Sequence, residues 1–84
     1  MPVEEDPEQL SDEELDRILA ELEAEETDVS RLRRRLHDRL ASFPNEVTEQ
    51  QEREVTKRRR ELHARIDALR AERSKRREDA APDG

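Results

Sequence analysis

The chain has 84 residues, of which 30% are hydrophobic and a single one, Phe43, is aromatic, which excludes a large globular core. Charged residues make up 49% of the sequence, a composition typical of either a disordered chain or a long exposed helix. Cysteine is absent, which excludes disulfides, and no apolar run approaches the roughly 20 residues that span a bilayer. We therefore expect a cytoplasmic chain that is stabilised by helix packing or by a partner.

The first ten residues contain two prolines and a block of acids, which predicts a disordered N-terminus over 1–10. This segment also lacks the basic and apolar regions of a signal peptide. Ser11 and Glu14 form a capping box, so a first helix is predicted over about 11–43. Its apolar residues recur at spacings of three, four or seven and predict a coiled-coil seam made of Leu15, Ile18, Leu22, Val29, Leu32, Leu36 and Phe43.

Pro44 ends the first helix because it lacks a backbone N–H and restricts the residue before it. Thr48 and Gln51 repeat the capping-box pattern, which predicts a second helix over about 48–77 and a disordered tail over 78–84. A connection this short makes the two helices antiparallel neighbours. The predicted fold is therefore all-α, a two-helix antiparallel coiled-coil hairpin over 11–77. The seam of the second helix consists of Val55, Leu62, Ile66 and Leu69.

Charge is segregated along the chain, because residues 1–28 carry 13 acids and one base whereas residues 57–77 carry ten bases and three acids. A hairpin places these two segments side by side, so they attract each other. The apolar core is thin, since its burial offsets only part of an ordering entropy of about 1 to 2 kcal/mol per residue. We therefore expect a homodimer, a protein partner or a bound ligand to complete the fold.

An internal repeat relates the two helices: residues 26–41 (ETDVSRLRRRLHDRLA) and 52–67 (EREVTKRRRELHARID) share seven identities in sixteen positions. The matched polar residues follow spacings of four, three, four and four, which places them on one stripe of each helix. In a hairpin that turns near Asn45, Arg33 should face the neighbourhood of Arg59, with a pseudo-twofold axis between the copies. Two facing arginines repel each other unless an anion lies between them, which favours a symmetric, doubly anionic ligand. The candidate binding residues are Glu26, Ser30, Arg33 and His37 in the first copy and Glu52, Thr56, Arg59, His63 and Asp67 in the second.

Other interpretations of the stripe remain open from the residues alone. The same pattern is compatible with the solvated flank of a structural or scaffolding coiled coil that binds no ligand. Basic clusters at 57–60 and 73–77 would suit nucleic acid, but the net charge of −7 and the lack of aromatic residues argue against it. No second ligand pair accompanies His37 and His63, so a metal site is not predicted. No nucleophile, glycine-rich loop or paired carboxylates in a cleft support an enzyme.

At the stripe residues the sequence resembles the RsiG family of actinobacterial anti-sigma factors, also described as aerial mycelium formation proteins. That family carries the signature E-x3-S-x2-R-x3-Q-x3-D on an antiparallel helical hairpin, and the resemblance covers about residues 15–73. It implies binding of cyclic di-GMP and no other cofactor. It also implies that the loaded hairpin holds the sporulation sigma factor WhiG inactive.

Three kinds of departure from the family signature affect these expectations. His37 and His63 stand where the family has Gln, Thr56 stands where it has Ser, and Ala41 takes the place of the first Asp. Because alanine accepts no hydrogen bond from guanine, the first copy is expected to be weak, with Arg33→Ala less harmful than Arg59→Ala. Some family branches resemble single-motif proteins that act as homodimers, so the intact second copy could also pair across two chains.

Overall fold

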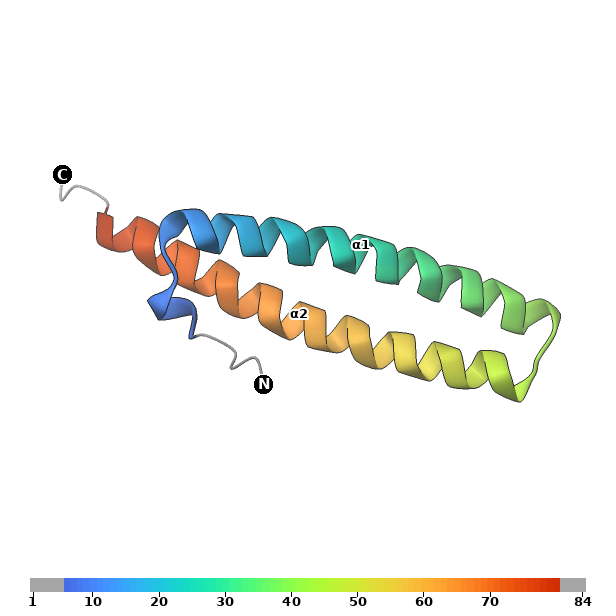
Figure 1. The fold of residues 1–84 in the computed structure, drawn as a ribbon. Coiled ribbons are helices and arrows are strands. Elements are labelled where there is room, and N and C mark those ends of the chain that lie inside the picture. Colours follow the sequence, from blue (N-terminus) through green and yellow to red (C-terminus); the bar gives the residue numbers. More distant parts are fainter. Residues whose placement is uncertain (1–5, 81–84) are drawn as a thin grey trace.

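The chain folds as a hairpin of two long helices, seen in a computed structural model that describes residues 6–80. A short 3-10 helix, η1 (Pro7–Gln9), precedes α1 (Asp12–Ser42) and α2 (Glu46–Ala80). The two long helices run antiparallel, with the connection at one end, here called the turn end, and the start of α1 at the other, the open end (Figure 1). The predicted all-α helical hairpin is confirmed. Within the described residues, neither helix combines the length and apolar character needed to cross a membrane.

Side-chain caps determine where both helices begin. The Oγ of Ser11 accepts a hydrogen bond from the Glu14 backbone N–H at 3.1 Å, as the capping box predicts. The prediction that α2 starts at Thr48 is wrong, because the cap is Asn45, whose Oδ1 accepts from the Thr48 backbone N–H at 2.8 Å. The helix therefore begins at Glu46, directly after the connection through Pro44 and Asn45.

The apolar core is concentrated at the open end. Leu15 and Leu19 of α1 and Leu69 of α2 are at most 2% exposed, and Leu10 and Ile66 complete the same cluster. Burying side chains of this kind contributes roughly 1.5 to 3 kcal/mol each. The core therefore fixes the two helices against each other at the end where no covalent connection joins them.

The seam becomes thinner toward the turn end. Leu62 and Leu36 are buried, but Leu32 is 39% exposed and Phe43 is 74% exposed. The seam prediction is therefore wrong for Phe43, which follows the last residue of α1 and no longer lies on the helix face that packs against α2. Leu19, which the predicted seam left out, is instead one of the most buried residues.

The segment before α1 is held against the end of α2 by Arg76. Its Nη2 group donates to the carbonyl oxygens of Leu10 at 2.6 Å and Pro7 at 3.0 Å, and its Nη1 group pairs with Asp12 at 2.8 Å. The prediction of disorder is therefore wrong for residues 7–10, and the contact of the acidic start with the basic end is confirmed. The predicted tail is helical as far as Ala80, while residues 1–5 and 81–84 lie outside the described part.

Candidate functional site

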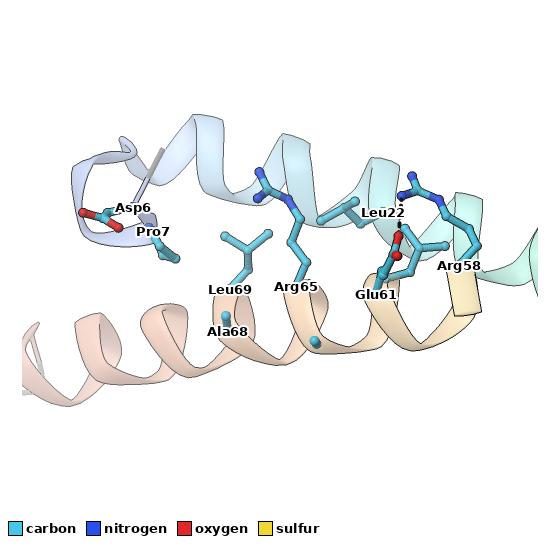
Figure 2. Close-up of a pocket in the computed structure, with 10 residues that line it drawn as sticks. Asp6, Pro7, Leu22, Arg58, Glu61, Arg65, Ala68 and Leu69 are labelled. Carbon is cyan, nitrogen blue, oxygen red and sulfur yellow. Dashed lines mark ion pairs between the residues drawn. The ribbon is translucent and has the colours of Figure 1, made fainter. Parts of the chain in front are cut away.

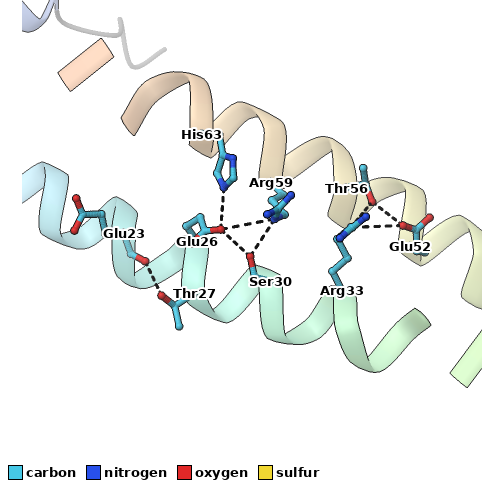
Figure 3. A network of polar contacts seen from close by, with 9 residues as sticks. All are labelled: Glu23, Glu26, Thr27, Ser30, Arg33, Glu52, Thr56, Arg59 and His63. Carbon is cyan, nitrogen blue, oxygen red and sulfur yellow. Dashed lines mark hydrogen bonds and ion pairs between the residues drawn. The ribbon is translucent and has the colours of Figure 1, made fainter. Parts of the chain in front are cut away.

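The two polar stripes lie on the same flank of the hairpin and meet across the seam, as Figure 3 shows. We call this side of the molecule the stripe flank. Residues from both copies of the repeat contact one another there through side-chain hydrogen bonds and ion pairs. Of the nine predicted binding residues, eight belong to these contacts; they are Glu26, Ser30, Arg33, His37, Glu52, Thr56, Arg59 and His63.

The network nearer the open end joins two residues of α1 to two of α2, and we call it the open-end network. Ser30 donates to Glu26 Oε1 at 2.7 Å within α1. From α2, Arg59 Nε donates to Ser30 Oγ at 3.1 Å, and His63 Nε2 lies 2.8 Å from Glu26 Oε1. Arg59 Nε is also 3.7 Å from that carboxylate oxygen, so Glu26 is the acceptor around which the network is built.

The turn-end network repeats this arrangement with the helices exchanged. Thr56 donates to Glu52 Oε1 at 2.7 Å within α2. From α1, Arg33 Nε donates to Thr56 Oγ1 at 3.3 Å, and His37 Nε2 lies 2.8 Å from Glu52 Oε1. Arg33 Nε is 3.8 Å from the same oxygen. The predicted pseudo-twofold relation between the two copies is thus present in the side-chain contacts themselves.

Each network takes its acid and hydroxyl from one copy of the repeat and its arginine and histidine from the other. Arg33 faces the neighbourhood of Arg59, as predicted, and the antiparallel register places each arginine opposite the hydroxyl of the other copy, three residues before the other arginine. Glu52 and Glu26 balance the two guanidinium charges, which removes the predicted repulsion. We call each network, together with the residues beside it, a half-site. Each half-site therefore requires both helices.

The arginines retain unused hydrogen-bonding groups. Both Arg33 and Arg59 use Nε for the contact across the seam, and neither donates from Nη1 or Nη2 to any described residue. Their side chains are 35% and 37% exposed, so these donors are accessible on the stripe flank. Two guanidinium groups anchored at Nε thus keep their Nη donors for planar, bidentate recognition of an anion or a guanine edge.

The two central carboxylates are stabilised in their ionised form. Hydrogen bonds from His63 and Ser30, together with the charge of Arg59, lower the pKa of Glu26 below its ordinary value. Hydrogen bonds from Thr56 and His37, with the charge of Arg33, lower the pKa of Glu52 in the same way. Both glutamates are therefore charged at neutral pH and keep the arginines oriented.

Asp67, the ninth predicted residue, is exposed, and its side chain makes no hydrogen bond to the residues that the structure describes. It lies beside the open-end network and lines a hollow of about 290 Å³ with His63 and Glu26. The same hollow is lined by Glu23 and Arg70, which the sequence analysis did not single out. A signal for Arg70 was present, because it follows His63 by seven residues and so continues the same helix face.

A larger hollow, of about 670 Å³, lies on the opposite side of the hairpin, here called the back flank (Figure 2). Its lining includes apolar residues such as Leu22 and Leu69, but none of the predicted binding residues. Arg58 on this flank pairs with Glu25 at 2.6 Å and with Glu61 at 3.6 Å. The back flank therefore lacks the combination of hydroxyl, imidazole and guanidinium groups that characterises the stripe flank.

The chain is therefore a helical hairpin of the coiled-coil class, with polar groups of both helices converging on one flank. A family model described as RsiG-like matches residues 45–83, which include all of α2, and this match supports an RsiG-type protein. The match covers the second copy of the stripe and thereby confirms the resemblance for that copy. The RsiG-like family suggests an anti-sigma factor role with a sigma factor as partner, and it is not an enzyme family. No curated protein and no solved structure matches the chain.

Proposed function

We propose that this chain is a cyclic di-GMP-responsive anti-sigma factor that binds the nucleotide along the stripe flank and then sequesters a WhiG-like sigma factor. The RsiG-like match supports the anti-sigma role. The observation that carries the nucleotide role is the pair of arginines, Arg33 and Arg59, with Nε anchored across the seam and the Nη groups unused.

The chemistry of the stripe flank suits this ligand. Cyclic di-GMP has twofold symmetry, two phosphates and two guanines, and the two networks are related by a pseudo-twofold axis. An arginine fork can donate to a phosphate or to guanine O6 and N7. Glu26 and Glu52 are negatively charged and accept hydrogen bonds on Oε1 within the hairpin. The guanidinium Nη groups are therefore the donors that can contact an anion.

Binding of the sigma factor follows if the nucleotide contacts both proteins. A ligand placed on the stripe flank presents its own polar edges and base faces outward, which gives the hairpin a surface that the free protein lacks. By linkage, the nucleotide then raises the affinity of the hairpin for the sigma factor by the same factor by which the sigma factor raises the affinity for the nucleotide. The hairpin therefore acts as a sensor whose partner binding depends on the second messenger.

Isothermal titration with cyclic di-GMP tests the nucleotide role. The wild-type chain should bind with a dissociation constant of about 1 μM or tighter, near −8 kcal/mol. The double variant Arg33→Ala/Arg59→Ala should lose about 100-fold or more, because it removes two charge-assisted contacts. Arg58→Ala is the matched control, since it breaks a cross-helix ion pair on the back flank. Absence of binding by the wild type, or equal binding by the double variant, rejects the proposal.

Size-exclusion chromatography with a purified WhiG-like sigma factor tests the second half of the proposal. The two proteins should co-elute when cyclic di-GMP is present and separate when it is omitted. The Arg33→Ala/Arg59→Ala variant should fail to co-elute under both conditions. Co-elution that is independent of the nucleotide would contradict a ligand-dependent mechanism while leaving an anti-sigma role intact.

A structural coiled coil without a ligand is the second candidate function. It is favoured by one observation, that Oε1 of each stripe glutamate already makes two hydrogen bonds within the hairpin. In that case the networks serve only to fix the register of α1 and α2. Thermal unfolding would then show a loss of stability in Arg33→Ala/Arg59→Ala, and the titration with cyclic di-GMP would show no binding by any variant.

A further inference from the structure

The stripe flank continues beyond the predicted motif at the open end. The hollow of about 290 Å³ beside the open-end network is bordered by Asp67 and Arg70 of α2 and by Glu23 of α1, with Ile66 from the core. Its volume lies at the lower limit of the roughly 300 to 1,000 Å³ typical of small-molecule sites. It suits a single base better than an entire dinucleotide.

At the turn end, two of this hollow's polar residues, Asp67 and Arg70, have no polar counterpart. The repeat offset that relates His63 to His37 also relates Asp67 to Ala41 and Arg70 to Pro44. Neither alanine nor proline has a side chain that donates or accepts a hydrogen bond. The two half-sites therefore share their four-residue networks, but the positions of Asp67 and Arg70 carry a carboxylate and a guanidinium only in the open-end half-site.

Asp67 and Arg70 offer complementary groups for a guanine. The carboxylate of Asp67 makes no hydrogen bond to the described residues, so it can accept from guanine N1–H and N2–H₂. Arg70 is 53% exposed and is held by one contact, from Nη2 to Glu23 Oε1 at 3.1 Å. Its remaining donors can reach guanine O6 and N7, the contact that arginine most often makes with this base.

We propose that Arg70, positioned by Glu23, reads a guanine in a subsite beside Asp67, the acid that the family signature already places next to the base. This inference rests on the proposed function and deepens it, because it makes the two half-sites unequal. The open-end half-site binds the nucleotide through its network and reads one base, whereas the turn-end half-site lacks the reading groups. Arg70 is thus a specificity residue outside the family signature, and the acid that it contacts, Glu23, comes from α1.

Titration of the full chain with cyclic di-GMP and with cyclic di-AMP tests the subsite. Adenine presents N6–H₂ where guanine presents O6, so a donor such as Arg70 distinguishes the two bases. Arg70→Ala should weaken cyclic di-GMP binding about 10-fold or more and leave cyclic di-AMP binding unchanged, which reduces the preference for guanine. Arg58→Ala is the control, because it removes a cross-helix ion pair of similar exposure on the back flank.

Arg70→Lys separates base reading from a purely structural role. Lysine retains the charge that pairs with Glu23 but lacks the planar fork. It should keep the wild-type unfolding midpoint and lose most of the preference for guanine. If the wild type binds cyclic di-GMP but Arg70→Ala and Arg70→Lys bind it as tightly as Arg58→Ala does, the subsite is rejected and the proposed function stands. If the wild type binds no nucleotide, both are rejected together.

Discussion

The open-end and turn-end halves of the hairpin carry the same polar network on different supports. The distance from arginine Nε to the opposing hydroxyl is 3.1 Å at Arg59 and 3.3 Å at Arg33, so the motif geometry is closely repeated. The open end adds the leucine-rich core, the Arg76 contacts and an acid–arginine pair. The turn end instead has the exposed side chains of Phe43 and Val47. Any difference in ligand affinity between the two half-sites must therefore arise from the residues around the networks.

The largest expected effect is on the core that supports the open end. Leu69 is 1% exposed, so Leu69→Ala should lower the free energy of unfolding by about 2 to 5 kcal/mol through lost burial and a cavity. Leu32→Ala near the turn end, where the side chain is 39% exposed, should cost less than half as much. Urea unfolding followed by circular dichroism measures both, and equal losses would show that the core is evenly distributed.

The thin seam also leads to a prediction about assembly. We expect the unfolding midpoint to rise with protein concentration or with added cyclic di-GMP, because a bound partner stabilises the folded state by mass action. Thermal unfolding at several protein concentrations, with and without the nucleotide, measures this. A high midpoint that is independent of both, together with a monomer in sedimentation at micromolar concentration, would contradict the expectation.

The next largest effect is on nucleotide binding. It tests whether each half-site is built from both helices or from the motif of a single helix. Glu26→Gln should weaken cyclic di-GMP binding by about 10-fold or more, because Glu26 belongs to the half-site that also contains Asp67. Glu52→Gln should weaken cyclic di-GMP binding less, because Glu52 belongs to the turn-end half-site. This holds although Glu52 and Asp67 lie in the same copy of the repeat. Arg59→Ala should likewise cost more than Arg33→Ala. A larger loss for Glu52→Gln in isothermal titration would show that each helix acts as a separate motif.

A smaller effect is expected at the cap of α2. Asn45→Ala removes the acceptor for the Thr48 backbone N–H and should lower the free energy of unfolding by about 1 kcal/mol. Gln51→Ala, at the other position of the predicted capping box, should change it by less than about 0.5 kcal/mol, because Gln51 is exposed. Chemical unfolding of both variants measures the difference, and the opposite ranking would restore Thr48 as the cap.

The mildest effect concerns pH. The folded-state pKa values of Glu26 and Glu52 lie below the ordinary value of 4.5, so the unfolded chain binds protons first as pH falls. Their contribution to stability is therefore complete above about pH 4.5 and is lost as pH falls through the lowered pKa values. Thermal unfolding between neutral and acidic pH should show a shallower decline in Glu26→Gln/Glu52→Gln. An unchanged slope would show that the two carboxylates do not contribute.

Local spacing made much of this structure predictable. The three- and four-residue intervals place the repeated polar residues on one face of a helix irrespective of what it packs against, so the convergence of the two stripes follows from sequence. The Ser11 cap is equally local, since its partner is Glu14. The single-helix pattern did not determine the register between the helices, because a short connection is compatible with more than one offset. Spacing therefore predicts that Arg33 faces the neighbourhood of Arg59, but not that its direct partner is Thr56.

Other features could not be found because they depend on contacts between distant residues. The composition of residues 1–10 predicts disorder, yet Leu10 is buried in the core and Arg76, far along the chain, binds the backbone there. At the turn, two overlapping capping patterns compete. Asn45 prevails because its side chain reaches the Thr48 backbone N–H immediately after the proline. The sequence does not rank such alternatives, since either residue can cap the first turn of a helix that begins directly after it.

The contacts of Arg76 have an evolutionary consequence. Two of its hydrogen bonds end on the carbonyl oxygens of Pro7 and Leu10, and every amino acid supplies such an oxygen. Substitutions at Glu8 or Gln9 therefore leave this anchoring possible, whereas inserting or deleting one residue would move the acceptors out of reach. This anchoring therefore constrains the number of residues between Pro7 and Leu10 more than their identity.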